Sequence, residues 1–371
     1  MTSAEKITGN IHKLSLLKLL KMLERPPRAI KSRIERSLQA SKDWDTVRDI
    51  EEKNQKLDSS TIKKCREYAK DIFGSEIYST ELAIYCIIYG SWCDGWIPES
   101  WFQEYVVKGS AGSLYKLSNE KTLSNHFFKS ESIPDVAYFV NGRFYSRNWR
   151  KLSEKEVKPH LFENGDRVVF KKNASKRGRG VQTLSKDLFS EVDMRSLGNG
   201  CFQSYIEPHH TVPSFGVTSV PTLRIVTTLD RSGVATPRIA NLRLGRIHNT
   251  HVISDDQVLV PICIESGRLK ALGYLGDWTP LQAHPDTNLS FHGEVYPEFT
   301  TAVELCLKNH EKVPMFLSIG WDVCLNINGS FDIMEWNLLH GIKYGEAIYG
   351  PTFSDLKWER DFGKNRQLHP K

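Results

Sequence analysis

Short runs of alternating apolar and polar residues follow one another from about residue 115 to residue 340, with turn residues between them. Runs of this kind, rich in β-branched and aromatic residues, predict short strands. An apolar repeat at helical spacing over residues 297–310 predicts a helix. Strands mixed with helices and many hairpin turns favour an α+β architecture over a doubly wound parallel sheet. The predicted strands cover residues 167–171, 181–184, 201–206, 221–229 and 239–244.

The N-terminal region has a different pattern. Residues 11–25 carry apolar side chains at roughly helical spacing with lysines between them, and Pro26 and Pro27 end the run. We expect this basic amphipathic helix to pack on its own protein, and contact with an anionic membrane surface is the alternative. Residues 76–92 predict an apolar helix or a buried strand. The tryptophan-rich loop that follows is expected to anchor a core.

A hairpin is predicted for residues 317–337, with its turn at Asn328-Gly329. This dipeptide favours a two-residue type I′ loop. With that loop, Ile327 pairs with Ser330. Counting back along both strands then places residue 322 opposite residue 335.

Two carboxylates therefore face each other across this hairpin. They belong to Asp322 and Glu335, and Asn337 shares their face because side chains alternate along a strand. Opposed carboxylates repel each other unless a hard cation lies between them. Oxygen ligands of this kind, completed by water and phosphate, suit Mg²⁺. The alternative is an ordinary hairpin with a solvated acidic face.

Composition narrows the class of protein. The chain has 371 residues, of which 40% are hydrophobic and 25% charged, values that fit globular domains with a substantial core. The seven cysteines are scattered without a CxxC pair, which indicates reduced thiols in a cytosol. A net charge of +6 suits polyanionic ligands such as nucleotides but is too small to indicate nucleic acid. No apolar run is long enough to span a membrane.

A second motif occupies residues 168–184. One strand ends at Lys171, a loop with Gly178 and Gly180 follows, and a second strand starts at Val181. Glycines let backbone N–H groups approach phosphate oxygens, and a lysine on the strand adds a point charge. The GxxxxGK[ST] spacing of a P-loop is absent. A basic surface hairpin or an RNA-contacting segment is the alternative interpretation.

Three further features follow along the chain. Residues 202–207 form a predicted strand that can offer backbone groups to a base edge, while Glu207 can hold a ribose. Arg224 and Arg243 lie on predicted strands with apolar flanks. Guanidinium groups in such positions suit carboxylate or phosphate, including a developing phosphoryl charge. Structural salt bridges are the alternative for both.

Taken in this order, these features resemble the ATP-grasp fold. The sequence is most similar to the sugar-transfer associated ATP-grasp family, distant relatives of carboxylate–amine ligases such as D-alanine–D-alanine ligase. The resemblance runs from about residue 92 to about residue 350. It implies two subdomains that clamp ATP, with Mg²⁺ as cofactor.

The resemblance also implies roles for individual residues. Lys121 and Lys171 would be the two lysines that hold the ATP phosphates, under a flap formed by Gly178, Gly180 and Val181. The adenine hinge would be Gln203, Tyr205 and Ile206, with Glu207 or His210 at the ribose. Arg224 and Arg243 would face the γ-phosphate and the acyl-phosphate, and Asp322, Glu335 and Asn337 would hold Mg²⁺, with Asn249 as a weaker candidate.

The chain departs from the family pattern at several positions. Glu120 stands where an aspartate usually precedes the first lysine, Lys172 where a proline often follows the second, and Gln203 where the hinge often begins with glutamate. The segment after Asn249 lacks the expected paired glycines. This departure bears on the resemblance at the site of the acceptor substrate more than at the ATP site.

These features predict four regions and one leading function. The regions are a helical extension at 1–75, a linking region of the ATP-grasp module at 76–165, a small subdomain at 166–208 and a large subdomain with the metal site at 209–371. The resemblance implies an ATP- and Mg²⁺-dependent ligase that joins a small-molecule carboxylate to an amine, on an amino-acid or sugar-acid substrate of cell-surface polysaccharide synthesis. A cytoplasmic location is expected, and no nucleic-acid partner. The alternatives are a phosphotransferase acting on a hydroxyl and a non-catalytic protein that binds nucleotide or nucleic acid.

Overall fold

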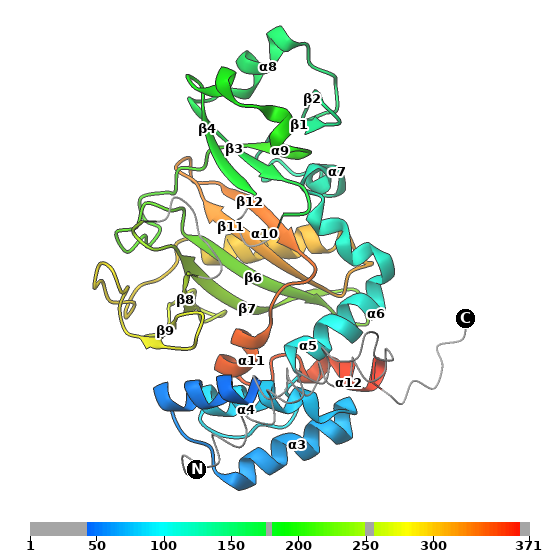
Figure 1. Cartoon of the computed structure of the whole chain (residues 1–371), viewed down its shortest axis with the longest axis vertical. Coiled ribbons are helices and arrows are strands. Elements are labelled where there is room, and N and C mark those ends of the chain that lie inside the picture. Colours follow the sequence, from blue (N-terminus) through cyan, green and yellow to red (C-terminus); the bar gives the residue numbers. More distant parts are fainter. Residues whose placement is uncertain (1–42, 176–179, 249–255, 364–371) are drawn as a thin grey trace, which may run out of the picture.

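The computed structural model describes residues 43–175, 180–248 and 256–363. Two antiparallel sheets are stacked along the long axis of the molecule, and a helical unit lies at the far end of the larger sheet (Figure 1). The expected helix at residues 11–25, Gly178 and Asn249 lie outside the described residues. Within those residues, no helix has both the length and the apolar character needed to cross a membrane.

The smaller sheet has five strands and a core of its own. Phe170 and Phe202 face α8 (Glu154–Leu161) and the short segments after β4, and both rings are fully buried. A capping box begins α8, with Ser153 and Glu156 bonding reciprocally. The strand order is β2 (Arg143–Ser146), β1 (Asp135–Val140), β5 (Gly200–Ser204), β3 (Arg167–Lys172) and β4 (Val181–Ser185).

The larger sheet has seven antiparallel strands, and α10 (Phe299–His310) covers its central part. Every residue of the two central strands β6 and β11 is buried, so both faces of the sheet are covered there. The helix covers one face, and the other faces the small sheet. The strand order is β10 (Pro280–Leu281), β9 (Gly273–Tyr274), β8 (Val258–Pro261), β7 (Ala235–Leu244), β6 (Thr222–Leu229), β11 (Ser318–Leu325) and β12 (Phe331–Asn337).

The helical unit packs on the large sheet through α11 (Lys343–Tyr349), which contacts α4 (Ser79–Tyr89). Trp96 and Trp101 are fully buried in the shared core, which confirms that the tryptophan-rich loop anchors a core. The other helical segments are 43–53, α3 (Ser59–Phe73), η1 (Glu76–Tyr78), α5 (Glu99–Trp101), η2 (Phe102–Val107), α6 (Lys108–Ala111), η3 (Gly112–Asn119), η4 (Lys121–Leu123), α7 (Ser124–Phe128), η5 (Phe189–Glu191), α9 (Met194–Leu197), η6 (Ser354–Leu356) and α12 (Trp358–Asp361).

The predicted elements are confirmed with small shifts at their ends. All five predicted strands are present, and the run at 76–92 is a helix and not a strand. The small sheet also takes β1 and β2 from the region expected to be a linker, since β1 pairs with β5. The four-part division of the chain therefore stays a proposal, and its small subdomain is better drawn to include residues 135–146.

The turn of the β11–β12 hairpin differs from the prediction. Asn326 pairs with Ser330 around a three-residue loop, with an N–H···O distance of 2.8 Å from the Asn326 amide to the Ser330 carbonyl. The Asn326 side chain accepts bonds from the amides of Asn328 and Ser330, which stabilises the longer loop. Gly329 supplies the left-handed residue that this loop needs, at φ 78°. The two-residue type I′ turn was therefore wrong.

A β-bulge in β12 compensates for the one-residue shift in strand register that the longer loop produces. Val323 pairs with Ile333 but Asp322 pairs with Glu335, so Met334 is an extra residue in β12. The predicted opposition of Asp322 and Glu335 is therefore confirmed, although the turn that implied it is different.

Candidate active site

A cavity of about 230 Å³ lies between the facing sides of the two sheets. The small sheet contributes β3, β4 and β5, the large sheet contributes β6, β7, β11 and β12, and Lys121 reaches in from the segment before α7. Most of the predicted site residues line it, although they are distributed over more than 200 positions of sequence: Lys121, Lys171, Val181, Gln203, Tyr205, Ile206, Arg224, Arg243, Asp322, Glu335 and Asn337.

One part of the cavity is apolar. Val169 and Val181 come from the small sheet, Ile206 follows β5, and Met334 is the bulged residue of β12. Beside them, the Arg167 guanidinium lies 3.8 Å from the centroid of the Tyr205 ring, which holds the connection between the sheets in place. An apolar slot of this kind suits a flat heterocycle such as a nucleobase.

Lys171 and Gln203 project from the small sheet beside this slot. The Lys171 ammonium donates to the Met334 carbonyl at 2.9 Å, and burial lowers its pKa, with Glu335 acting in the opposite direction. The Gln203 amide donates to Asp135 at 2.9 Å. Burial raises the pKa of Asp135, although Gln203 and Tyr138 both donate to it. Sequence reasoning missed Asp135, whose only signal is a carboxylate in an otherwise apolar strand.

The strongest ion pair of the site joins Arg224 and Asp322 on neighbouring strands β6 and β11. The guanidinium is bidentate, at 2.6 and 2.7 Å from the two carboxylate oxygens. Arg243 on β7 lies 3.7 Å from the same carboxylate, and the Asn337 amide 3.4 Å from it. Burial acts to raise the pKa of Asp322, but the two arginines hold it below its usual value. Burial and the neighbouring Arg224 lower the pKa of Arg243 to about 10.

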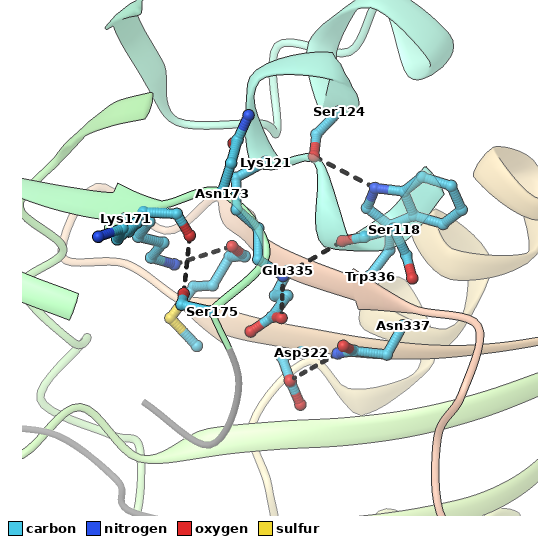
Figure 2. A network of polar contacts seen from close by, with 12 residues as sticks. Ser118, Lys121, Ser124, Lys171, Asn173, Ser175, Asp322, Glu335, Trp336 and Asn337 are labelled. Carbon is cyan, nitrogen blue, oxygen red and sulfur yellow. Dashed lines mark hydrogen bonds and ion pairs between the residues drawn. The ribbon is translucent and has the colours of Figure 1, made fainter. Parts of the chain in front are cut away.

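Glu335 has a cationic partner as well. Figure 2 shows Lys121 above the β11–β12 ladder, where its ammonium forms an ion pair with the Glu335 carboxylate. The same ammonium donates to the Ser118 carbonyl at 3.2 Å. The Lys121 side chain is only 9% exposed but Glu335 is 32% exposed, so the carboxylate keeps one side open to the cavity.

The donor set fits a hard divalent cation. Asp322, Glu335 and Asn337 supply oxygens from one face of one hairpin, and such carboxylate and amide oxygens are ligands for Mg²⁺. Within the described parts of the chain, no cluster of three or more Asp, Glu, His or Cys residues could hold a metal.

Three predicted residues lie away from the cavity. Glu207 is exposed, forms an ion pair with Arg167 at 3.3 Å and lines a separate cleft of about 700 Å³ behind the hinge. His210 stacks on His209 with ring centroids 4.2 Å apart, outside both cavities. Gly180 closes the β3–β4 loop, where an added Cβ would lie 2.4 Å from Ser175.

Sequence reasoning also missed polar residues on the large-sheet wall. Gln257, the residue before β8, lines the cavity. Its side-chain oxygen Oε1 is buried without a hydrogen-bond partner. Asn241 and Arg243 on β7 likewise each have one buried polar atom without a partner. No motif marks Gln257 or Asn241, because both follow from strand register alone.

Two antiparallel sheets that close on a cavity lined by lysines, arginines and opposed carboxylates define the ATP-grasp class. The scan of protein families matches residues 151–355 to the family described as sugar-transfer associated ATP-grasp. This match covers more than half of the chain, so the protein belongs to that family. The expected family and fold class are both confirmed. No curated protein matches the chain.

Several solved structures are similar in fold. The biotin carboxylase domain of 2-oxoglutarate carboxylase from Hydrogenobacter thermophilus, solved with MgADP and bicarbonate, is 14% identical with a TM-score of 0.41, over 70% of this chain and 48% of that one. N5-carboxyaminoimidazole ribonucleotide synthetase from Thermotoga maritima is 11% identical with a TM-score of 0.34, over 69% and 54%. L-amino acid ligase from Bacillus licheniformis is 11% identical with a TM-score of 0.35, over 66% and 48%. The chain thus spans about half the length of these proteins.

Proposed function

We propose that the protein is an ATP- and Mg²⁺-dependent ligase that activates a carboxylate as an acyl-phosphate and transfers the acyl group to an amine. An amino acid or a sugar acid of cell-surface polysaccharide synthesis is the proposed substrate class. The description of the family as sugar-transfer associated supports that class. The observation that carries the proposal is the convergence of Lys121, Lys171, Arg224 and Arg243 on the same cavity as two opposed carboxylates.

The proposed chemistry divides the cavity between nucleotide and substrate. The adenine would lie in the apolar slot beside Tyr205 and Ile206, and the ammonium groups of Lys121 and Lys171 would neutralise the phosphates. Asp322, Glu335 and Asn337 would hold Mg²⁺, which would supply positive charge that offsets the charge of the phosphates.

Arg224 and Arg243 act on the reacting groups in this scheme. A carboxylate oxygen attacks the γ-phosphorus, the bond to the β–γ bridging oxygen breaks, and ADP leaves. The amine nitrogen then attacks the acyl carbon, inorganic phosphate leaves, and the nitrogen loses a proton. The two guanidinium groups are fixed in a buried setting before charge develops, which is the arrangement that stabilises a transition state most.

The ion pairs of the nucleotide-free cavity support this assignment. Arg224 neutralises Asp322 and Lys121 neutralises Glu335, so each of the two carboxylates proposed as metal ligands has a cationic neighbour. With Mg²⁺ bound to the carboxylates, these two cations would be free to pair with the phosphates. The exchange of partners leaves no buried charge without a counter-charge.

An assay for ADP with hydroxylamine as the amine tests the proposal. Carboxylates that are substrates will give ADP together with a hydroxamate, because hydroxylamine traps the acyl-phosphate. A panel of amino acids and uronic acids is the sensible starting set. ADP formed with a hydroxyl compound and no hydroxamate would show a phosphotransferase instead.

A matched pair of variants separates an enzyme from a simple binder. Asp322→Asn should abolish hydroxamate formation. Asp355→Asn breaks a similar bidentate pair, with Arg238 on β7, but lies outside the cavity and should leave the activity unchanged. Salt-sensitive RNA binding without any binding of MgATP would support the non-catalytic alternative.

We also propose a cytoplasmic location, and peripheral membrane contact through residues 11–25 is the alternative to packing of this segment on its own protein. All seven cysteines are free thiols, which supports a reducing compartment. Co-sedimentation with vesicles containing anionic lipid tests the contact. Binding by the full chain but not by a chain without residues 1–42 would support the contact, and equal binding by both would contradict it.

A further inference from the structure

The segment from Ser118 to Ser124 connects the two walls of the cavity. It carries Lys121, and it lies between β12 of the large sheet and the loop that follows β3 in the small sheet (Figure 2). We infer that Asn173 and Glu120 are positioning residues that hold the phosphate-binding loop in register with Lys121. This inference rests on the proposed nucleotide site and adds residues to which that site assigns no role.

Contacts with the large sheet fix one side of this bridging segment. The Ser118 hydroxyl accepts from the Leu338 amide at 3.1 Å, and the Ser124 hydroxyl accepts from the Trp336 indole at 3.2 Å. Lys121 pairs with Glu335 between them. The segment is therefore attached at three points within seven residues to β12 and the residue that follows it.

The bridging segment packs against β5 of the small sheet, and Asn173 supplies the side-chain hydrogen bonds that join it to the loop after β3. Its side-chain nitrogen donates to the Glu120 carboxylate at 2.8 Å and lies 3.2 Å from the Thr122 hydroxyl. Its side-chain oxygen accepts from the Thr122 amide at 3.3 Å. Both ends of one amide are thus used on the two residues that flank Lys121.

The backbone beside Asn173 adds a further bond. The Ala174 amide donates to the Asn119 carbonyl at 2.8 Å. Ala174 has a φ of 54°, a left-handed conformation that a residue with a Cβ rarely adopts. The chain accepts this strained conformation at the point where it meets the bridging segment, which indicates that the contact constrains the backbone at Ala174.

The consequence concerns nucleotide binding. Lys171 and the loop after it belong to the small sheet, whereas Lys121, Asp322 and Glu335 are fixed to the large sheet. The Asn173 contact sets the distance between these two groups of phosphate and metal ligands together with the bond from Lys171 to the Met334 carbonyl. Loss of the contact would leave both groups intact but no longer placed to act on the same phosphates.

Calorimetric titration of the full chain with MgADP tests this coupling. Asn173→Ala should weaken MgADP binding by about tenfold, since the hydrogen bonds lost contribute together about 1.4 kcal/mol. Asn199→Ala is the matched control, because it removes another asparagine contact of the small sheet, to the Asn141 amide at 2.9 Å, without touching the bridging segment. The control should bind MgADP like the unmodified protein.

A variant that introduces a charge at residue 173, and a second substitution that compensates for it, distinguish loss of this contact from a general loss of folding. Asn173→Asp places a second carboxylate against Glu120 and should weaken MgADP binding at least as much as Asn173→Ala. Adding Glu120→Gln should restore binding, because the introduced glutamine can donate to the introduced aspartate.

Equal binding by Asn173→Asp and the unmodified protein, or no recovery in the double variant, would overturn the inference. Failure of the unmodified protein to bind MgADP would overturn the proposed function itself, and the inference with it.

Discussion

The site rests on a small number of charged side chains that neutralise one another. Arg224 and Asp322 are both almost fully buried, with side chains only 8% and 11% exposed. Removing one partner of such a pair leaves the other charge buried without compensation, which costs several kcal/mol. Glu335 is more exposed and pairs with Lys121 at the edge of the cavity. The two carboxylates among the proposed metal ligands should therefore respond differently to mutation.

Asp322→Asn should reduce both stability and activity. We expect the free energy of unfolding to fall by about 3 kcal/mol, because Arg224 loses its counter-charge, and ligase turnover to fall at least about 100-fold. Glu335→Gln should reduce turnover similarly with a much smaller loss of stability. Urea denaturation and ADP release measure the two effects. Equal loss of stability in both variants would contradict the different burial of the two pairs.

At the residue scale, sequence reasoning found those residues whose chemistry has a recognisable spacing. The Glu-x-Asn of residues 335–337 and the lysine before a glycine-rich loop are patterns of this kind. Asp135 and Asn173 could not be found that way. Each acts on a residue more than 50 positions away along the sequence, through contacts that exist only once the chain is folded.

At the scale of elements, the β11–β12 hairpin shows how a correct conclusion followed from a wrong turn. The Asn328-Gly329 dipeptide predicts a two-residue turn. The three-residue loop that forms instead shifts the register by one residue, which alone would place Asp322 and Glu335 on opposite faces. The bulge at Met334 shifts it back. Turn propensity depends on neighbouring residues and can be predicted from a sequence, whereas a bulge depends on what both strands pack against. That part of the register could not be predicted.

Two asparagine variants test the revised turn. Asn141 has a φ of 51° in the β1–β2 turn, so Asn141→Ala should lower the free energy of unfolding by about 1 kcal/mol through left-handed strain. Asn328 does not have a positive φ, so Asn328→Ala should change the free energy of unfolding by less than about 0.5 kcal/mol. Urea denaturation of both variants gives the comparison. Equal losses would indicate that both hairpins have type I′ turns after all.

At the scale of the whole molecule, a buried carboxylate joins the helical unit to the large sheet. Glu346 on α11 accepts from the Ile97 amide and from the amide and hydroxyl of Thr352. Burial raises the pKa of Glu346 to about 8, despite these bonds. The pattern of apolar residues predicts the division of the chain into sheets and a helical unit. It does not predict the contact between Ile97 and Glu346, because these residues lie 249 positions apart.

The raised pKa makes stability depend on pH. Between about pH 4.5, the ordinary value, and pH 8, the folded protein binds a proton at Glu346 that the unfolded chain releases, so stability falls as pH rises. The slope is at most about 1.4 kcal/mol per pH unit. Glu346→Gln removes this titration, so the stability difference between the unmodified protein and the variant should shrink from pH 5 to pH 8. A constant difference in thermal melting across this range would contradict the assignment.

The central claim is that the two sheets close on a nucleotide held through a metal at Asp322, Glu335 and Asn337. Calorimetric titration with a non-hydrolysable ATP analogue, with and without Mg²⁺, tests it most directly. The unmodified protein should bind the analogue at least about tenfold more tightly with Mg²⁺ than without it, a difference of about 1.4 kcal/mol, and Glu335→Gln should lose most of this difference. Failure to bind the analogue, or a Mg²⁺ effect that Glu335→Gln leaves unchanged, would contradict the account.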